Sequence, residues 1–235
     1  MGEIRGSIVE YGFIFDMDGV VIDSNPYHKI AWESFLDGQG YPYDDQTFDQ
    51  MLSGRTGPTS LKLLFGDDLP EDLLEEYLEK VDGKYQGILR EQEKAIPIAG
   101  VHNFIARIKN EGHRLALATS APPLNIEMGL EKLEMTETFE IIIGKVDVSH
   151  GKPHPEVYLK AVGKLGIPKE NCIVFEDSKA GIQSALAAGL PVVGIASAHS
   201  KEELLEEGVS LVVDDFTELQ LERVLDLIRQ NQLIS

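Results

Sequence analysis

An apolar run that ends abruptly in two acidic residues constrains this chain more than any other feature of its sequence. Residues 13–15 are Phe-Ile-Phe, and Asp16, Asp18 and Gly19 follow them. Because alternate residues of a strand point to the same side, a buried strand here places both acids together at its carboxyl end. Gly19 permits the tight turn that must follow. Ligands of open α/β sheets bind at this edge, so the stretch predicts either a binding site or a solvated surface turn.

Composition and charge narrow the classes of function. The chain has 235 residues, 43% of them hydrophobic, which suffices for one core domain with a small insertion. Its net charge of −19 predicts that it binds neither nucleic acid nor an anionic membrane, because both require basic patches. Cys172 is the single cysteine, so we expect neither a disulfide within the chain nor a thiolate metal cluster. No apolar stretch is long enough for a membrane span and no signal sequence is evident, so we expect a cytoplasmic protein.

The periodicity of the apolar residues divides the chain into two kinds of segment. Residues 24–94 have helical periodicity and no convincing strand. The rest alternates continuous apolar strands with helices, which predicts a parallel sheet covered on both faces. We therefore expect a helical domain over 24–94, inserted between the two parts of an α/β core domain, 1–23 and 95–235. The strands are expected at 11–16, 115–118, 139–143, 172–175, 192–195 and 209–213.

Three further strand ends carry polar residues. Thr119 and Ser120 follow one strand, where hydroxyl and backbone N–H groups can hold a phosphate oxygen, although Thr-Ser is also ordinary in loops. Lys152 lies between glycine and proline just before a helix, where a plain surface lysine is the commoner interpretation. Glu176 and Asp177 directly follow a buried strand, and as a bare pair they can also cap the helix after it.

The combination of these strand ends points to a metal site. A parallel sheet brings Asp16, Asp18, Glu176 and Asp177 to one edge. Two like charges about 4 Å apart repel by roughly 4 kcal/mol at an effective dielectric of 20, so these acids beside Lys152 require protons or a cation. Mg²⁺ is the natural solution, because it takes oxygen ligands and also binds substrate phosphate. A carboxylate nucleophile, a metal, a lysine and a hydroxyl are the parts of phosphoryl transfer through an aspartyl-phosphate.

The sequence resembles a known family at four motifs, which occur in this order: Asp16-Met17-Asp18-Gly19-Val20, Thr119, Gly151-Lys152-Pro153 and Glu176-Asp177-Ser178-x-x-Gly181. They match the motifs of the haloacid dehalogenase superfamily, and the resemblance spans essentially the whole chain. The helical insertion resembles the cap of the β-phosphoglucomutase-like phosphatase branch. The resemblance implies a Rossmann-like parallel sheet with helices on both faces, and a small α-helical cap domain inserted after the first strand.

The resemblance also implies a role for each motif residue. Asp16 would attack phosphorus, and Asp18 would protonate the leaving oxygen and later activate the attacking water or hydroxyl. Thr119 and Lys152 would bind the phosphoryl oxygens, with Lys152 also neutralising Asp16. The implied ligands of Mg²⁺ are Asp16, the backbone carbonyl of Asp18, Asp177, and Glu176 either directly or through water.

A phosphatase and a mutase of this branch share the core, so only the inserted segment can distinguish the two activities. His28 lies where that mutase carries a histidine and would sense substrate and position Asp18; the alternative is a histidine on an amphipathic helix face. Residues 52–57 resemble the substrate-specificity loop, in which Arg55 is a candidate clamp for a distal phosphate or carboxylate. Arg55 lies two positions before the loop arginine of the mutase, with Gly57 in its place, which favours a phosphatase. The predicted substrate-binding residues are His28, Gly54, Arg55, Thr56 and Ser120.

Several alternatives use the same residues or the same fold class. β-Phosphoglucomutase, a pyrophosphatase and a non-catalytic regulator are alternatives on this fold, although such a regulator would tolerate loss of Asp16 or Asp18, and both are present. A receiver domain lacks the large helical insertion and has another motif order. A dinucleotide-binding module is disfavoured, because no Gly-x-Gly-x-x-Gly or Walker A pattern follows a strand. We expect a monomer, because such a cap moves relative to the core. The expected substrate is a small phosphorylated metabolite.

Overall fold

A six-stranded parallel sheet forms the centre of the protein, as the alternation of strands and helices predicts. The structure, a computed structural model, describes residues 9–44, 56–93 and 95–233. The strand order is β3-β2-β1-β4-β5-β6, so β1 lies in the middle of the sheet. The strands are β1 (Gly12–Phe15), β2 (Arg114–Ala118), β3 (Ile141–Ile143), β4 (Cys172–Glu176), β5 (Val192–Ile195) and β6 (Leu211–Val213).

The register of β1 brings the polar strand ends together. Phe15 pairs with Leu117 of β2 on one side and with Phe175 of β4 on the other. The residues that follow these partners are therefore neighbours along one edge of the sheet. Side chains alternate between the two faces, with Phe13 and Phe15 in one hydrophobic cluster and Ile14 in the other.

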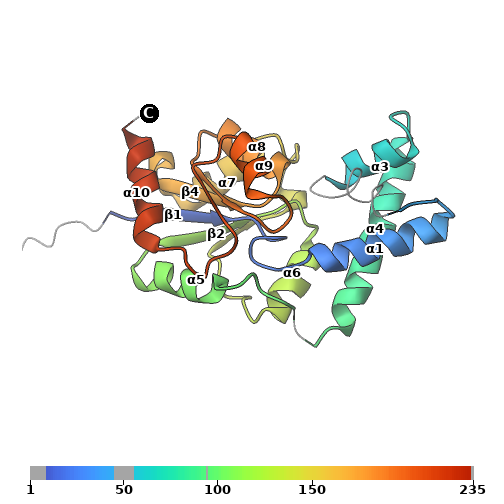
Figure 1. The fold of residues 1–235 in the computed structure, drawn as a ribbon, viewed down its shortest axis with the longest axis horizontal. Helices are drawn as coiled ribbons and strands as arrows, with labels where there is room; N and C mark the ends of the chain where they lie inside the picture. The colour runs from blue at the N-terminus through green and yellow to red at the C-terminus, as the bar shows by residue number, and fades with distance from the viewer. Residues whose placement is uncertain (1–8, 45–55, 94, 234–235) are drawn as a thin grey trace, which may run out of the picture.

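Helices cover both faces of the sheet (Figure 1). On the face of Phe13 and Phe15, the cluster includes residues of α5 (Val101–Asn110), α6 (Pro123–Lys132) and α10 (Leu221–Gln232). On the other face it includes residues of α7 (Glu156–Leu165), α8 (Lys179–Ala187) and α9 (Lys201–Glu206). The continuous apolar strands are buried on both sides, as expected for a parallel sheet.

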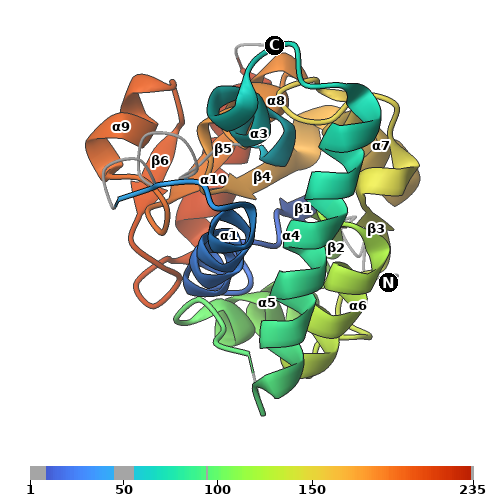
Figure 2. The same cartoon turned by 90° about the vertical axis from the view of Figure 1, so that its right-hand side faces the viewer.

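Three helices of the inserted segment lie beyond the carboxyl edge of the sheet (Figures 1 and 2): α1 (Asn25–Gln39), α3 (Gly57–Phe65) and α4 (Glu71–Glu91). They share a small hydrophobic core that includes Trp32, Phe35 and Leu61. Tyr85 and Leu89 of α4 instead join the cluster on the sheet side, so α4 connects the two groups of helices. The division into a cap domain and a core domain stays a prediction.

The two segments that link the inserted helices to the sheet run side by side. Asp23 N–H donates to the carbonyl of Ile96 at 2.8 Å, and Ile98 N–H donates to that of Val21 at 3.1 Å. Both crossings predicted from the sequence, near residue 24 and between residues 93 and 100, therefore meet at one place. A paired, two-stranded connection of this kind restrains where α1 begins and where α4 ends.

The structure corrects three details of the sequence prediction. The third strand in the sequence begins at Ile141 rather than at Phe139, although Phe139 is buried against Phe15. The last strand begins at Leu211 rather than at Val209, which is also buried but precedes the ladder. The short helix α9 was not predicted, because a six-residue helix is too short for apolar periodicity to show. Among the described helices, none is both long and apolar enough to span a membrane.

The aromatic stack on one face of β4 should contribute strongly to the free energy of unfolding. Phe175 is fully buried, with its ring centroid 4.5 Å from that of Phe15 and 5.6 Å from that of Phe104. We expect Phe175→Ala to lower the free energy of unfolding by about 3–5 kcal/mol, because it leaves a cavity in a packed core. Leu205→Ala is the control, since Leu205 is 54% exposed, and it should change stability by about 0.5 kcal/mol or less. Urea denaturation measures both, and equal effects would contradict this description of the core.

Candidate active site

A buried lysine joins two of the predicted acids. Lys152 Nζ donates to Asp16 Oδ1 at 2.8 Å, to Glu176 Oε1 at 2.6 Å and to the carbonyl of Ala118 at 3.2 Å. Its side chain is 4% exposed. Burial alone would lower the pKa of Lys152, but the charges of Asp16 and Glu176 raise it above its ordinary value, so the group is a cation. The structure therefore excludes the interpretation of Lys152 as a plain surface lysine.

Glu176 is fully buried and accepts hydrogen bonds on both carboxylate oxygens. Oε1 accepts from Lys152 and from the Tyr158 hydroxyl at 2.7 Å. Oε2 accepts from Asp177 N–H, Ser178 N–H and Ser178 Oγ. Burial would raise the pKa of Glu176, but Lys152 and these donors lower it, so it is ionised. With so many donors already on it, this carboxylate is placed to anchor Lys152, whereas its predicted role as a metal ligand stays a prediction.

Gly181 is required for this arrangement. It lies in the first turn of α8, and its N–H donates to Ser178 Oγ, which caps the helix. A Cβ atom at Gly181 would lie 1.7 Å from Glu176 Oε1. Only glycine lets the start of α8 approach the carboxylate this closely.

Asp177 and Gly19 meet on the opposite side of Asp16. Gly19 has φ of +71°, and a Cβ there would lie 1.8 Å from Asp177 Oδ2, so the turn predicted after the first strand requires glycine. Ser197 was not singled out from the sequence. Its hydroxyl lies 2.7 Å from the Gly19 carbonyl and 3.0 Å from Asp177 Oδ2, and its single proton can be donated to either. It thereby holds the β1 turn against the end of β4.

The charges of the described residues fit a divalent cation. Carboxylate oxygens of Asp16, Glu176 and Asp177 lie within 4.8 Å of one another. Burial, together with the negative charges of Glu176 and Asp18, raises the pKa of Asp16 to about 7 in spite of Lys152. Burial and the negative charges of Glu176, Asp16 and Asp18 also raise the pKa of Asp177. Both shifts have one physical meaning: the site has more negative charge than Lys152 can balance, and hard oxygen ligands of this kind suit Mg²⁺.

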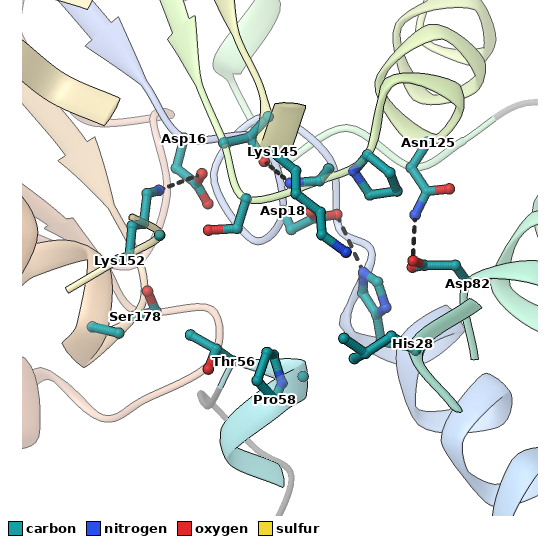
Figure 3. Close-up of a pocket in the computed structure, with 18 of the residues that line it drawn as sticks. Asp16, Asp18, His28, Thr56, Pro58, Asp82, Asn125, Lys145, Lys152 and Ser178 are labelled. Carbon is teal, nitrogen blue, oxygen red and sulfur yellow. Dashed lines mark hydrogen bonds and ion pairs between the residues drawn. The ribbon is translucent and has the colours of Figure 1, made fainter. Parts of the chain in front are cut away.

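Asp18 has different partners from Asp16. Its Oδ1 accepts from Ser24 Oγ at 2.7 Å and lies 3.4 Å from His28 Nε2 (Figure 3). Burial would raise the pKa of Asp18, but His28 and Ser24 lower it below its ordinary value. The His28 ring stacks on Tyr85 of α4, with 4.2 Å between centroids. The structure thus brings His28 to Asp18, as the sequence predicted, and holds its ring from a second helix.

The remaining predicted residues lie at the end of β2, in the inserted segment, or outside the described residues. Thr119 is buried at the end of β2, and its Oγ1 accepts from Ala121 N–H at 3.1 Å. Ser120 follows it on the pocket wall. Thr56 caps α3 and faces the same pocket from the inserted segment. Gly54 and Arg55 lie outside the described residues.

The site is a pocket of about 770 Å³, and both the sheet edge and the inserted helices line it (Figure 3). Asp16, Asp18 and Lys152 form part of its wall on the sheet side. The sequence prediction missed several further residues that line the pocket: Asn25, Asp82, Asn125 and Lys145. For Asp82 one signal was present, because it is polar beside the apolar helix positions Val81 and Tyr85. For Asn125 the signal was weaker, since it is a single amide in a helix after Pro123.

Known proteins share both the sequence and the fold. The sequence profile of the haloacid dehalogenase-like hydrolases matches residues 13–195. A phosphorylated carbohydrates phosphatase of Thermotoga maritima is 31% identical over 202 residues, which cover 85% of this chain and 92% of that protein. A β-phosphoglucomutase of Bacillus subtilis is 28% identical over 214 residues, 89% of this chain and 91% of that protein. The crystal structure of a HAD hydrolase of family IA, variant 3, from Entamoeba histolytica has a TM-score of 0.85 and 31% identity, covering 93% of this chain and 99% of that chain.

The four motifs, the parallel sheet and these similarities agree, and they confirm the family resemblance. The profile match includes the first strand with its two acids, the lysine and the acid pair after β4. The chain therefore belongs to the haloacid dehalogenase-like hydrolase family, in its β-phosphoglucomutase-like branch.

Proposed function

We propose that the protein is a Mg²⁺-dependent phosphatase that hydrolyses a small sugar phosphate through an aspartyl-phosphate on Asp16. The observation that carries the proposal is the buried carboxylate of Asp16, held by Lys152 within a group of acids whose charge exceeds that of the lysine. Such an arrangement attracts a divalent cation and a phosphoryl group together. The similarity to the Thermotoga phosphatase supports the class of reaction.

The geometry of Asp16 suits a nucleophile. Lys152 holds Oδ1 at 2.8 Å, which fixes the carboxylate plane while Oδ2 attacks phosphorus. Attack forms the Oδ2–P bond and breaks the bond from phosphorus to the leaving oxygen. The Thr119 hydroxyl then donates to a phosphoryl oxygen and the charge of Lys152 stabilises the phosphoryl group, since both residues line the pocket beside Asp16.

Asp18 serves as the acid and then as the base. The negative charge that a phosphoryl group brings raises the pKa of Asp18, which favours the protonated form needed at the leaving oxygen. Once the leaving group has departed, His28 and Ser24 favour the ionised form again. That carboxylate accepts a proton from the water that attacks the aspartyl-phosphate, which regenerates Asp16 and releases phosphate.

Asp16, Asp177 and the backbone carbonyl of Asp18 would hold Mg²⁺, with Glu176 behind them. When bound, the ion neutralises the acids and polarises the phosphoryl oxygens. Ser197 fixes the direction of Asp177 toward the turn of Gly19. Glu176 thus orients the lysine, whereas Asp177 presents an oxygen to the ion.

A β-phosphoglucomutase is the second candidate, favoured by the similarity to the Bacillus enzyme. The two reactions share the first step and differ in the acceptor of the phosphoryl group, which is water in a phosphatase and a sugar phosphate hydroxyl in a mutase. The position of Arg55, two residues before the loop arginine expected of a mutase, favours the phosphatase. The experiment that tests the proposal therefore has to follow both products.

We expect Mg²⁺-dependent phosphate release from at least one substrate in a panel of sugar phosphates, phosphoglycolate, nucleotides and pyrophosphate. Asp16→Asn should reduce the rate at least 10³-fold, because it removes the nucleophile. Asp72→Asn, an isosteric change on the exposed start of α4, is the matched control. In parallel, β-glucose 1-phosphate is incubated with enzyme that has been primed with the sugar bisphosphate, and the formation of glucose 6-phosphate is measured.

The outcomes of this panel are distinct. Phosphate release that depends on Asp16 supports the phosphatase. Formation of glucose 6-phosphate without free phosphate supports the mutase instead. Full activity of a purified Asp16→Asn variant would contradict covalent catalysis at this residue.

The shifted acids also predict a dependence of stability on pH. Because folding raises the pKa of Asp16 from 3.8 to about 7, Asp16 without metal keeps its proton in the folded state and loses it in the unfolded chain between these values, and it contributes stability there. The stabilisation is complete below pH about 4 and is lost as the pH rises toward about 7. Mg²⁺ takes the place of the protons, so it should raise the Tm more at pH 8 than at pH 5. Differential scanning fluorimetry with Mg²⁺ or with EDTA measures this, and an equal shift at both pH values would contradict it.

A further inference from the structure

The inserted helix α4 places a carboxylate in the wall of the pocket opposite the reacting acids. Asp82 lines the pocket together with Asp16, Asp18 and Lys152, which come from the sheet edge. Figure 3 shows its carboxylate on the far side of His28 from Lys152. A substrate whose phosphate lies at Asp16 therefore extends its leaving group toward α4.

A core residue fixes the direction of this carboxylate. Asn125 of α6 is 2% exposed, and its Nδ2 donates to Asp82 Oδ1 at 3.3 Å. Its Oδ1 accepts from Gln86 Nε2 at 2.8 Å. Asp82 and Gln86 are four residues apart, so they share one face of α4. Because an ionised carboxylate only accepts hydrogen bonds, the amide orientation of Asn125 is determined: its nitrogen faces Asp82 and its oxygen faces Gln86.

The carboxylate of Asp82 can accept further hydrogen bonds. A carboxylate accepts up to about four, and Asn125 provides one. Burial raises the pKa of Asp82, although Lys145 and Asn125 act in the opposite direction. A half-buried carboxylate in a pocket wall gains from any further donor that enters the pocket with a substrate. Hydroxyl groups are such donors, whereas a second phosphate at this position would be repelled.

We infer that Asp82, oriented by Asn125, forms a hydroxyl-binding subsite for the leaving group and selects polyhydroxylated phosphate monoesters. This inference rests on the proposed phosphatase function and names the residues that select its substrate. Asp82 accepts a hydrogen bond from a sugar or polyol hydroxyl while Asp18 serves the ester oxygen. Asn125 is a positioning residue that acts through Asp82.

A comparison of two kinds of substrate tests this subsite. kcat/KM is measured with Mg²⁺ for glucose 6-phosphate, fructose 1-phosphate and glycerol 1-phosphate, for propyl phosphate, an alkyl ester without an additional hydroxyl, and for p-nitrophenyl phosphate. The readout is the ratio of kcat/KM for the best hydroxylated substrate to that for propyl phosphate, because both alkyl leaving groups need a proton from Asp18. A variant that merely loosens α4, and so disturbs Asp18 through His28, lowers both values and leaves the ratio unchanged.

We expect Asp82→Asn to lower this ratio about tenfold or more, because a hydrogen bond to a charged acceptor is lost while the side-chain shape is kept. Asn125→Ala should lower the ratio in the same direction. Glu79→Gln is the matched control, because it removes one acid from the exposed face of the same helix, and its ratio should equal that of the wild type. Should Asp82→Asn not fold, the ratio for Asn125→Ala decides by the same criterion.

The result that would overturn the subsite differs from the result that would overturn the proposed phosphatase. An active wild type whose ratio is unchanged by Asp82→Asn overturns the subsite and leaves the phosphatase standing. An active wild type that hydrolyses p-nitrophenyl phosphate but none of the hydroxylated esters overturns the subsite as well. A wild type that releases phosphate from none of the substrates overturns the proposed function, and the subsite with it.

Discussion

The ammonium group of Lys152 joins three segments that are distant in sequence, and the geometry of the site depends on it. It binds Asp16 after β1, the carbonyl of Ala118 at the end of β2 and Glu176 at the end of β4. All three contacts are buried, so removal of the ammonium group would leave Asp16 and Glu176 without their cation, at a cost of about 3–5 kcal/mol. The lysine thereby holds Asp16, the proposed nucleophile, in one orientation. One cation cannot balance the acids around it, which supports the proposed Mg²⁺ site.

The division between anchoring and reacting groups follows from hydrogen bonding. Glu176 accepts from Lys152, Tyr158 and the first residues of α8, which makes it a fixed part of the framework. Asp18 instead has partners from the inserted segment, Ser24 and His28, and the ring of His28 rests on α4. A movement of the inserted helices would therefore change the surroundings of Asp18, the proposed acid–base residue, while the contacts of Lys152 with Asp16 stay in place. In the proposed mechanism, this arrangement couples the position of these helices to the proton-transfer steps.

Much of the sheet edge could be predicted from the sequence, because strand ends in a parallel sheet converge whatever the loops do. The acids after β1 and at the end of β4 were found in this way, whereas the role of Lys152 came from the family resemblance, and the structure brings these residues together. The contact of Asn125 with Asp82 could not be predicted, because it depends on how α4 packs against α6, across 43 residues of sequence. Ser197 was missed for the same reason, since a serine after a strand has no periodic signal. The hydrogen-bond partners of Glu176 also required coordinates, because the pattern Glu-Asp alone does not tell which acid faces the pocket.

The central claim is that the side chain of Asp16 becomes phosphorylated during turnover. The most direct test is to mix the enzyme with Mg²⁺ and its best substrate, quench the reaction with acid within the first turnover, and examine the peptides by mass spectrometry. The account predicts one phosphoryl group on the peptide that contains Asp16, at an acid-stable and base-labile acyl phosphate, and none in Asp16→Asn. A phosphoryl group on another residue, or turnover with no phosphopeptide at any quench time, would contradict the account.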